Sequence, residues 1–353
     1  MELNNIIFPS IFIIIGFVLS KYLLLIIKNS KTNLLVDNQF KKPQAFHESS
    51  TYRLGGIIIF TLLVLVFLYL YFYKDIFLYE YFSFCVLFFI LGLIDDLKIN
   101  IAPKFRLLIM ITFLVVLVIS NEIYIKKTGL EFLDHLVAID IFSLMFICLC
   151  FLFIINGSNL IDGFNGLLGI HSLIIFSVLF AINFFQNNTT LIYVLFYSIL
   201  LTLIFLKFNF PKAQFFLGDS GAYLLGILIA ISVIKTSNLN PSISPFFFCI
   251  LLFYLFFEVF FSFFRKLFFA RQSPLLPDNK HLHMTLYKTL LKKNKKKLIS
   301  NYSVSIYINL FYILAITPGI IFMNDGLFCR YYFFVLLIVY TYFYKTLNKR
   351  VTR

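Results

Sequence analysis

The sequence predicts an all-α protein, a single polytopic bundle of about eleven transmembrane helices that occupies the whole chain, residues 1–353. The mean hydropathy is +0.94 and 61% of the residues are apolar, which excludes an ordinary soluble globule. The apolar residues form continuous windows of about 17–25 residues, the length that a helix needs to cross ~30 Å of hydrocarbon. Only helices and closed barrels satisfy their backbone in lipid, and continuous rather than alternating windows favour helices.

Eleven windows meet this description, with ten as the alternative count. The first is too long for a removable signal peptide and lacks a small-residue cleavage site. The predicted spans cover residues 6–27, 55–73, 78–94, 105–120, 139–156, 166–185, 190–206, 221–235, 246–263, 299–321 and 327–344.

Lysine and arginine predict the orientation of the bundle. If the N-terminus is outside, the inside segments contain 24 of the 30 Lys and Arg residues. This asymmetry predicts a multi-pass protein of the cell (inner) membrane whose inside loops are cytoplasmic. The net charge of +14 is then mainly an orientation signal with some attraction for anionic lipids, and we expect no nucleic-acid partner.

Two adjacent acids, Asp95 and Asp96, close the apolar run 78–94 in a chain with only 13% charged residues. Such neighbours repel each other and the anionic headgroups, and a divalent cation would relieve both costs. Oxygen ligands favour Mg²⁺ or Mn²⁺, and Mg²⁺ is usually held by one or two carboxylates together with substrate phosphates. Solvated charge at a helix end is the alternative.

Three polar residues in "NGSNLIDGFNG", Asn156, Asn159 and Asp162, follow one another at intervals of three. One helical turn would place them on a single face, where amide and carboxylate groups could line a site. Capping of the next helix is the alternative.

Two further clusters place one charged residue beside glycines at a helix start. Arg53 in "HESSTYRLGG" could bind a phosphate while the glycines let backbone amides approach the anion. Asp219 in "NFPKAQFFLGDSG" also lies between glycines, which permit close backbone approach to a ligand. The alternatives are a membrane anchor for Arg53 and a helix cap for Asp219.

The fifth cluster is the inside segment Arg265–Thr285, which contains His281 and His283. Their spacing of two argues against a helical metal pair and favours binding of phosphate or hydroxyl groups, with simple solvation as the alternative. Glu258 is expected about 10 Å below the interface, where an ionisable group is functional or paired within the bundle.

All five clusters fall on predicted inside segments, whereas outside segments such as 121–135 are polar without a pattern. Chance placement of helix caps would not sort the clusters in this way. We therefore expect one site for a cation and phosphates on the inside face.

The motifs "RLGG", "GLIDD", "NGSNLIDGFNGLLG", "NFPKAQFFLGDSGAYLLG" and "PDNKHLHM" occur in this order over residues 40–290. They resemble those of the polyprenyl-phosphate N-acetylhexosamine-1-phosphate transferases, the MraY/WecA superfamily (glycosyltransferase family 4). The resemblance implies a bundle of ten or eleven helices that transfers a sugar 1-phosphate from a UDP-sugar to polyprenyl phosphate, releases UMP and needs Mg²⁺. Phosphoryl transfer asks mainly for positioning and charge neutralisation, which suits the clusters described above.

The resemblance also implies roles for individual residues. Asp219 and Asp162 would hold Mg²⁺ at the UDP diphosphate, and Asp95 and Asp96 would orient or deprotonate the lipid phosphate, which makes these four the expected catalytic residues. The expected substrate-binding residues for uridine, diphosphate and sugar are Arg53, Asn156, Asn159, Asn209, Arg271, His281 and His283.

Within the superfamily, the peptidoglycan branch carries a Pro-Thr-Met-Gly-Gly type stretch and a triple histidine, where this chain has "STYRLGG" and "HLHM". The chain therefore looks closer to the WecA/WbpL-type branch, which starts O-antigen and other envelope glycans. Three positions depart from the family pattern: Tyr52 replaces a Pro, Ala222 a Ser and Met284 a His.

The expected partners are a UDP-N-acetylhexosamine, polyprenyl phosphate and membrane lipids, and a homodimer is left open because aromatic spans can face lipid or a second subunit. One alternative is the phospho-N-acetylmuramoyl-pentapeptide translocase of the same superfamily. Another is a transporter or flippase for lipid-linked sugars, which would place ionisable residues deep in the spans, where Glu258 is the one clear candidate. A scaffold with an inactive site is the third.

Overall fold

The computed structural model describes residues 4–29, 35–37, 50–99, 101–271, 273, 279–294 and 296–352. The helices are α1 (Asn4–Asn29), α2 (Gly55–Lys74), α3 (Tyr79–Asp96), α4 (Pro103–Asn121), α5 (Glu131–Val137), α6 (Asp140–Ile161), α7 (Leu167–Phe185), α8 (Thr189–Asn209), α9 (Gly218–Leu239), α10 (Pro245–Leu251), α11 (Phe253–Phe264), α12 (Leu282–Asn294), α13 (Lys297–Ile321) and α14 (Gly326–Thr352), with a π-helix η1 (Arg265–Ala270) after α11.

The prediction of a helical membrane bundle is confirmed. Nine described helices are long and apolar enough to cross a membrane, or ten if α10 and α11 together form one broken span. The remaining predicted span, 78–94, coincides with α3, which falls outside this count because Glu80, Asp95 and Asp96 place three acids within its 18 residues.

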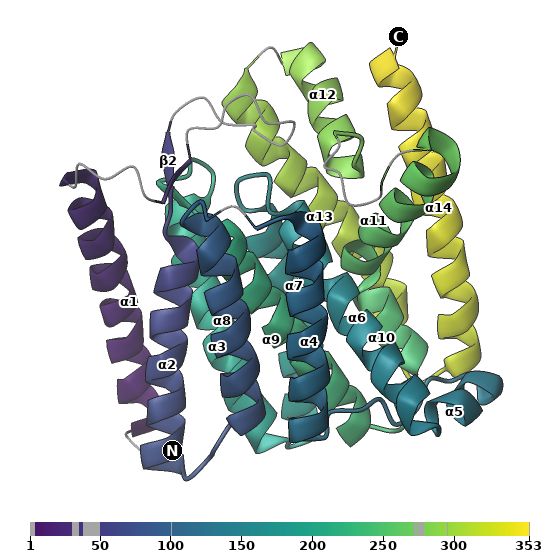
Figure 1. The fold of residues 1–353 in the computed structure, drawn as a ribbon, viewed down its shortest axis with the longest axis horizontal. Coiled ribbons are helices and arrows are strands. Elements are labelled where there is room, and N and C mark those ends of the chain that lie inside the picture. Colours follow the sequence, from purple (N-terminus) through teal and green to yellow (C-terminus); the bar gives the residue numbers. More distant parts are fainter. Residues whose placement is uncertain are drawn as a thin grey trace.

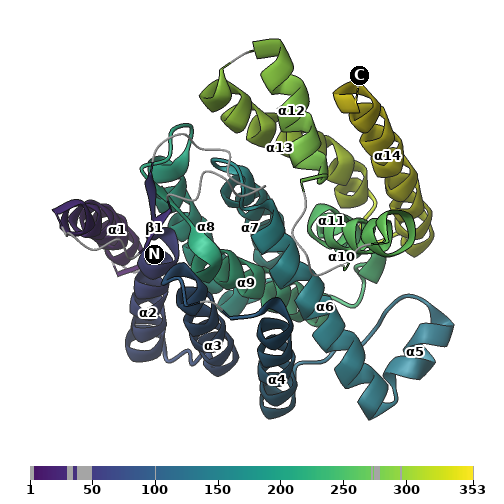
Figure 2. The same ribbon diagram turned by 45° about the horizontal axis from the view of Figure 1, so that its top comes forward.

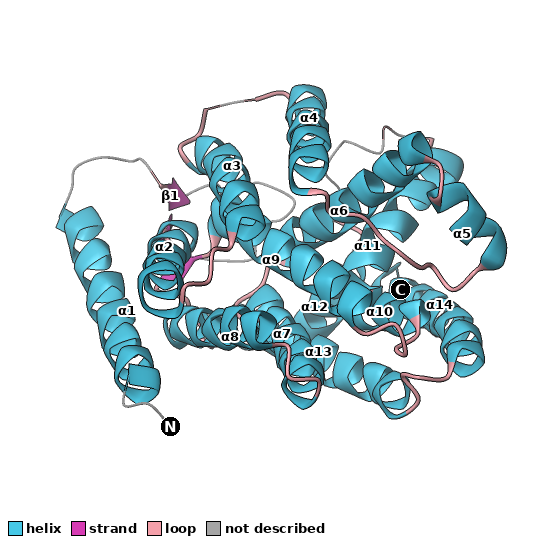
Figure 3. Cartoon of the chain, turned by 90° about the horizontal axis from the view of Figure 1, so that it is seen from below, coloured by secondary structure: helices cyan, strands magenta, loops and turns pink. Residues whose placement is uncertain are grey.

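The long helices run side by side, and α9 lies at the centre of the bundle (Figures 1, 2 and 3). Its apolar span is the most buried of the nine, whereas those of α1, α4 and α14 are among the least buried. The side chains that α1 and α14 expose are largely apolar, which suits helices that face lipid.

Three short strands lie at one end of the bundle: β1 (Val36–Asp37), β2 (Thr51–Arg53) and β3 (Phe215–Phe216). The sheet order is β1-β2-β3, with β1 antiparallel and β3 parallel to β2, so that Arg53 lies opposite Phe216. Figure 1 shows β2, α12 and the C-terminus at this same end. The sheet therefore joins the start of α2 to the start of α9.

Two glycines let neighbouring helices approach the first turn of α9. A Cβ on Gly92 of α3 would lie 2.4 Å from the Cα of Ser220, and a Cβ on Gly56 of α2 would lie 2.5 Å from the backbone nitrogen of Gly221. No side chain fits at such distances without a shift of backbone. The close approach brings the end of α3 within hydrogen-bonding distance of the start of α9.

The prediction of one continuous span over 246–263 is wrong in shape, because α10 and α11 meet at an angle of 75°. Contacts from other helices stabilise the bend. The Tyr312 hydroxyl donates to the carbonyl of Leu251 at 2.5 Å, and Gly157 of α6 packs so closely that a Cβ would lie 2.3 Å from the carbonyl oxygen of Leu255. Helices α5 and α12 also lie in segments for which the sequence predicts loops.

Candidate active site

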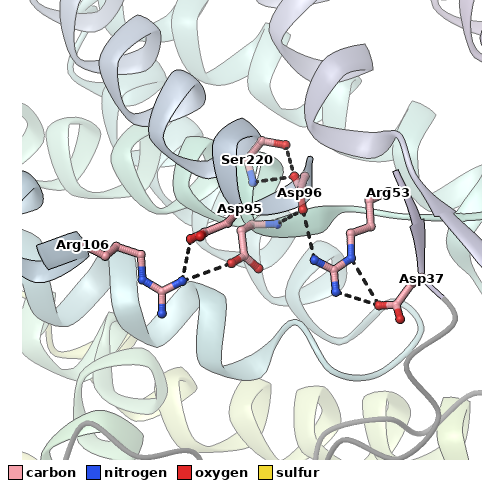
Figure 4. A network of polar contacts seen from close by, with 7 residues as sticks. Asp37, Arg53, Asp95, Asp96, Arg106 and Ser220 are labelled. Carbon is pink, nitrogen blue, oxygen red and sulfur yellow. Dashed lines mark hydrogen bonds and ion pairs between the residues drawn. The ribbon is translucent and has the colours of Figure 1, made fainter. Parts of the chain in front are cut away.

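Asp96 binds the first turn of α9 from a different helix. Its Oδ1 accepts the backbone N–H of Asp219 at 2.9 Å, and its Oδ2 accepts the backbone N–H and the hydroxyl of Ser220 at 3.0 and 2.6 Å (Figure 4). Gly218 just before them has φ +77°, and a Cβ there would lie 2.5 Å from Asp96 Oδ2. These bonds satisfy two of the N–H groups that a helix start leaves open. Asp96 thereby fixes the position of Asp219.

Arg53 reaches the same carboxylate from β2. Its Nη2 lies 2.8 Å from Asp37 Oδ2 and its Nη1 lies 3.5 Å from Asp96 Oδ1 (Figure 4). Burial by itself would lower the pKa of Arg53, but the charges of Asp219 and Asp37 outweigh it and raise that pKa above its usual value. Arg53 is therefore a fixed cation at the edge of the acidic cluster.

Asp95 takes a different partner from its neighbour. Arg106, in the first turn of α4, donates to Asp95 Oδ2 at 2.6 Å, and the same nitrogen lies 3.5 Å from Asp219 Oδ2. Arg106 was missed in the sequence analysis, where it counted only toward orientation. The sequence could have indicated this role, because Arg106 lies three residues after Pro103, in the first turn of the next helix. A basic side chain there is on the same side of the membrane as Asp95 and Asp96. Arg106 thus lies between the carboxylates of Asp95 and Asp219.

Asp162 caps the end of α6 and belongs to the same electrostatic cluster. Burial raises the pKa of Asp162 well above its usual value, the charges of Asp219 and Asp96 raise it further, and Arg53 opposes them. The loop after α6 is held near the start of α9, because Asn209 joins its Gly166 to Phe215 of β3. Contacts join Asp95, Asp96 and Asp219 through the start of α9 and Arg106, and the prediction that Asp162 shares their pocket stays a prediction.

Asn156 and Asn159 lie on the half-buried face of α6 that also carries Asp162, while Gly157 and Ser158 between them are buried. The Asn156 amide donates to the carbonyl of Leu152 at 2.8 Å, within its own helix. The Nδ2 of Asn159 is buried and has no hydrogen-bond partner within the described residues. A buried donor of this kind costs free energy unless an acceptor arrives, so Asn159 is suited to bind a ligand oxygen.

Asn209 is buried and holds two backbone segments together. Its Oδ1 accepts the N–H of Gly166 at 2.6 Å and its Nδ2 donates to the carbonyl of Phe215 at 3.0 Å. These bonds tie the loop after α6 to strand β3. In this structure Asn209 therefore positions the loop of Asp162, and the prediction that it binds substrate stays a prediction.

Glu258 is buried and paired, as expected for an ionisable group at its depth. Its Oε1 accepts the Leu282 N–H at 3.1 Å and lies 3.0 Å from His281 Nδ1, and its Oε2 accepts the Tyr340 hydroxyl at 2.5 Å. The carboxylate thus joins α11 to the start of α12 and to α14. This arrangement fixes the ring of His281.

Replacing Glu258 by alanine is expected to reduce the free energy of unfolding by about 2 kcal/mol, because buried donors from α12 and α14 would lose their acceptor. The thermal unfolding midpoint of the detergent-purified protein measures this change. Glu131→Ala, which removes an exposed acid from α5, is the matched control. Equal midpoints for the two variants would contradict the contacts of Glu258.

His283 is buried, and its Nδ1 lies 3.0 Å from the Tyr254 hydroxyl. The ring is stacked on that of His281 with centroids 5.5 Å apart, and lies 5.7 Å from the ring of Phe164. Phe164 follows Asp162 by two residues, so the histidine pair borders the same loop as the acidic cluster. Arg271 is exposed at the end of η1, and the structure shows no contact between it and the cluster.

The oxygen donors of the cluster bear on the predicted magnesium ion. Within the described residues, no group of three or more His, Cys, Asp or Glu is arranged so that it could hold a metal ion. The oxygens of Asp96 are occupied by α9, but Asp219 and Asp162 offer two carboxylates in one cluster. Mg²⁺ is commonly bound by one or two carboxylates, while water and phosphate oxygens occupy its other coordination positions. Asp219 and Asp162 therefore fit the ion.

Comparisons with known proteins find similar sequences over the segment that contains the acidic cluster. A family model described as glycosyl transferase family 4 matches residues 78–237, which include Asp95, Asp96, Asp162 and Asp219. An undecaprenyl-phosphate alpha-N-acetylglucosaminyl 1-phosphate transferase of Thermotoga maritima is 28% identical over 251 residues, 69% of this chain and 73% of that protein.

Other relatives bear a different name, phospho-N-acetylmuramoyl-pentapeptide-transferase. The one from Prochlorococcus marinus is 30% identical over 263 residues, 66% of this chain and 71% of that protein. The one from Dictyoglomus thermophilum is 36% identical over 205 residues, 55% of this chain and 62% of that protein. The chain thus spans less than two thirds of the Dictyoglomus relative.

Proposed function

The chain belongs to glycosyl transferase family 4, and on that basis we propose that it transfers a sugar 1-phosphate of the N-acetylhexosamine type from a UDP-sugar to polyprenyl phosphate. The products are a polyprenyl-diphosphate sugar and UMP. The relatives carry the names of phospho-sugar transferases, several of them acting on undecaprenyl phosphate, which supports this class of reaction.

One observation carries the proposal: acids from the end of α3 and the start of α9 lie together with two arginines, and the charges of Asp96 and Asp219 act on Asp162 at the end of α6. Asp96 holds the N–H of Asp219, and Arg106 lies between Asp219 and Asp95. A cluster of carboxylates with cations at its edge suits two phosphate-bearing substrates and a divalent ion. The alternative function, a flippase for lipid-linked sugars, would instead need ionisable groups near the midplane.

In the proposed reaction, an oxygen of the lipid phosphate attacks the phosphorus that carries the sugar. A new P–O bond forms, the bond between that phosphorus and the bridging oxygen of UMP breaks, and UMP leaves with the electron pair. Mg²⁺, held by Asp219 and Asp162, would neutralise charge on the diphosphate. The protein's own contribution is to orient the two phosphates and to offset their repulsion.

Each charged side chain has a place in this proposal. Arg106 and Arg53 bind phosphate oxygens, and Asp95 orients the lipid phosphate or accepts its proton. Asp96 acts through the α9 backbone as a positioning residue, since its oxygens are already occupied. Asn159 offers its buried amide to the nucleotide.

For the sugar, we propose an N-acetylhexosamine other than the muramyl-pentapeptide, on a cytoplasmic active site of the inner membrane. The "STYRLGG" and "HLHM" motifs support this branch, as does the name of the Thermotoga relative. His281, His283 and Arg271 are proposed to contact the diphosphate or the sugar.

The test is product analysis with the purified full chain, undecaprenyl phosphate, Mg²⁺ and a panel of UDP-sugars. We expect UMP release that depends on the lipid, together with a lipid product whose mass increases by one sugar phosphate. A reaction without the lipid phosphate is the control. Movement of a lipid-linked sugar across vesicles without UMP release would instead identify a flippase, and absence of both activities would favour the scaffold.

A further inference from the structure

A cavity of about 740 Å³ lies at the end of the bundle opposite the acidic cluster. Helix α9 begins at Gly218 in the cluster and ends at Leu239, only three residues before the lining residue Ser242. The other walls come from the connection between α4 and α5 and from the start of α14. The volume is within the usual range of small-molecule sites.

Positive charge predominates in this cavity. Lys127 and Arg330 line it, and the structure gives neither an ion pair with a described residue. Asp325 is the one acid among the lining residues, and its Oδ1 already accepts the N–H of Phe328 in the first turn of α14 at 2.9 Å. The first turn of this 27-residue helix adds partial positive charge.

Arg330 is held in place and still has a donor to offer. Its Nη2 donates to the carbonyl of Gly129 at 2.6 Å, and its guanidinium lies 5.7 Å from the ring centroid of Phe246. Its Nε is buried and has no hydrogen-bond partner among the residues described. A fixed guanidinium with an unused donor beside a cavity favours an anion with several oxygens.

The cavity opens at the depth of lipid headgroups. Its lining residues follow directly on the ends of apolar spans: α13 ends at Ile321, and α14 begins at Gly326. Beside it, the short helix α5 exposes Phe132 and Leu136, one helical turn apart, as a helix in the membrane interface does (Figure 2 shows α5 at the periphery of the bundle).

We propose that this cavity binds the phosphate of an anionic phospholipid headgroup in the leaflet opposite the active site. Lys127 and Arg330 pair with the phosphate oxygens, and Ser242 and Asn324 face the polar remainder of the headgroup. The acyl chains lie beside the apolar surface of α5. The site is separate from the substrates of the proposed reaction, which bind at the other end of α9.

The test compares two charge reversals of neighbouring lysines. Lys127→Glu removes a cation from the cavity, whereas Lys126→Glu changes an exposed lysine that does not line it. Arg330 is left intact because it also supports the backbone of Gly129. The thermal midpoint of each full-length protein in detergent is measured against increasing phosphatidylglycerol, phosphatidylcholine or inorganic phosphate, and the midpoint without lipid checks the fold.

We expect phosphatidylglycerol to raise the thermal midpoint of the wild type until the effect saturates. Lys127→Glu should raise the lipid concentration at half-saturation about tenfold, whereas Lys126→Glu should change it by no more than about twofold. Anionic lipid that binds the basic segments at the other end of the bundle shifts the thermal midpoints of both variants equally. Only the difference between the two variants therefore reports on the cavity. Equal responses of the two variants would overturn the proposal. So would equal stabilisation by phosphatidylcholine, or by inorganic phosphate alone, which would indicate a soluble anion.

Discussion

Replacing Asp219 by asparagine is expected to lower turnover about a thousandfold while the fold stays intact. Asparagine keeps the size of the side chain but removes the charge that, in the proposed reaction, holds Mg²⁺ at the diphosphate. A thousandfold loss corresponds to about 4 kcal/mol of barrier, as expected for a metal ligand at a phosphoryl centre. Asp219 is partly exposed, and among the described residues its carboxylate contacts only Arg106, at 3.5 Å, so stability should change by no more than about 1 kcal/mol.

UMP release in membranes and the thermal midpoint of the purified protein measure the two effects. Asp140→Asn, the same change at an exposed position in the first turn of α6, is the control and should retain activity. UDP should raise the midpoint of the wild type more with Mg²⁺ than without it, and the variant should lose this difference. Activity of Asp219→Asn within tenfold of the wild type would contradict the metal role.

Replacing Asp96 by asparagine should reduce the free energy of unfolding by about 3 kcal/mol as well as remove activity. All partners of this buried carboxylate are donors, and two are backbone N–H groups that cannot reverse their direction. Whichever way the amide is turned, its NH₂ faces at least one of them. One N–H at the start of α9 then loses its acceptor, and Asp219 loses its fixed position.

Asp95→Asn is the matched control, because it is the adjacent acid on the same helix and its partner is the half-exposed Arg106. We expect a loss of about 1 kcal/mol or less for this variant. Chemical denaturation or thermal unfolding of both proteins gives the comparison. If Asp95→Asn proves the more destabilising of the two, Asp96 does not hold α9 in the way described.

Together these variants separate two roles within the acidic cluster, catalysis and support of the start of α9. Asp219→Asn is expected to lose activity with stability retained, and Asp96→Asn to lose both. The pair at the end of α3 is thus divided: one carboxylate supports the start of α9, and the other is available to a substrate through its bridge to Arg106.

The membrane bundle could be predicted from the sequence because lipid imposes its conditions on each span separately. A window of apolar residues must form a helix wherever it lies, and neither its length nor its composition depends on its neighbours. The clustering of acids, amides and glycines on alternate loops was predicted for the same reason, since consecutive spans bring every second loop to the same face. The motifs added the chemistry of the site.

Only the tertiary structure decided which partner each of these polar side chains takes. Asp96 and the N–H of Asp219 are 123 residues apart in the chain, and no periodicity reports which of two neighbouring acids turns toward α9. The pairing of Glu258 with His281 and Tyr340, the bend between α10 and α11, and the role of Arg106 likewise depend on contacts between distant helices. Hydropathy and helix propensity act along the chain, whereas a hydrogen bond or ion pair depends on distances across it. The sequence therefore determined the elements and the chemical class of the site, and packing determined which residue does what within it.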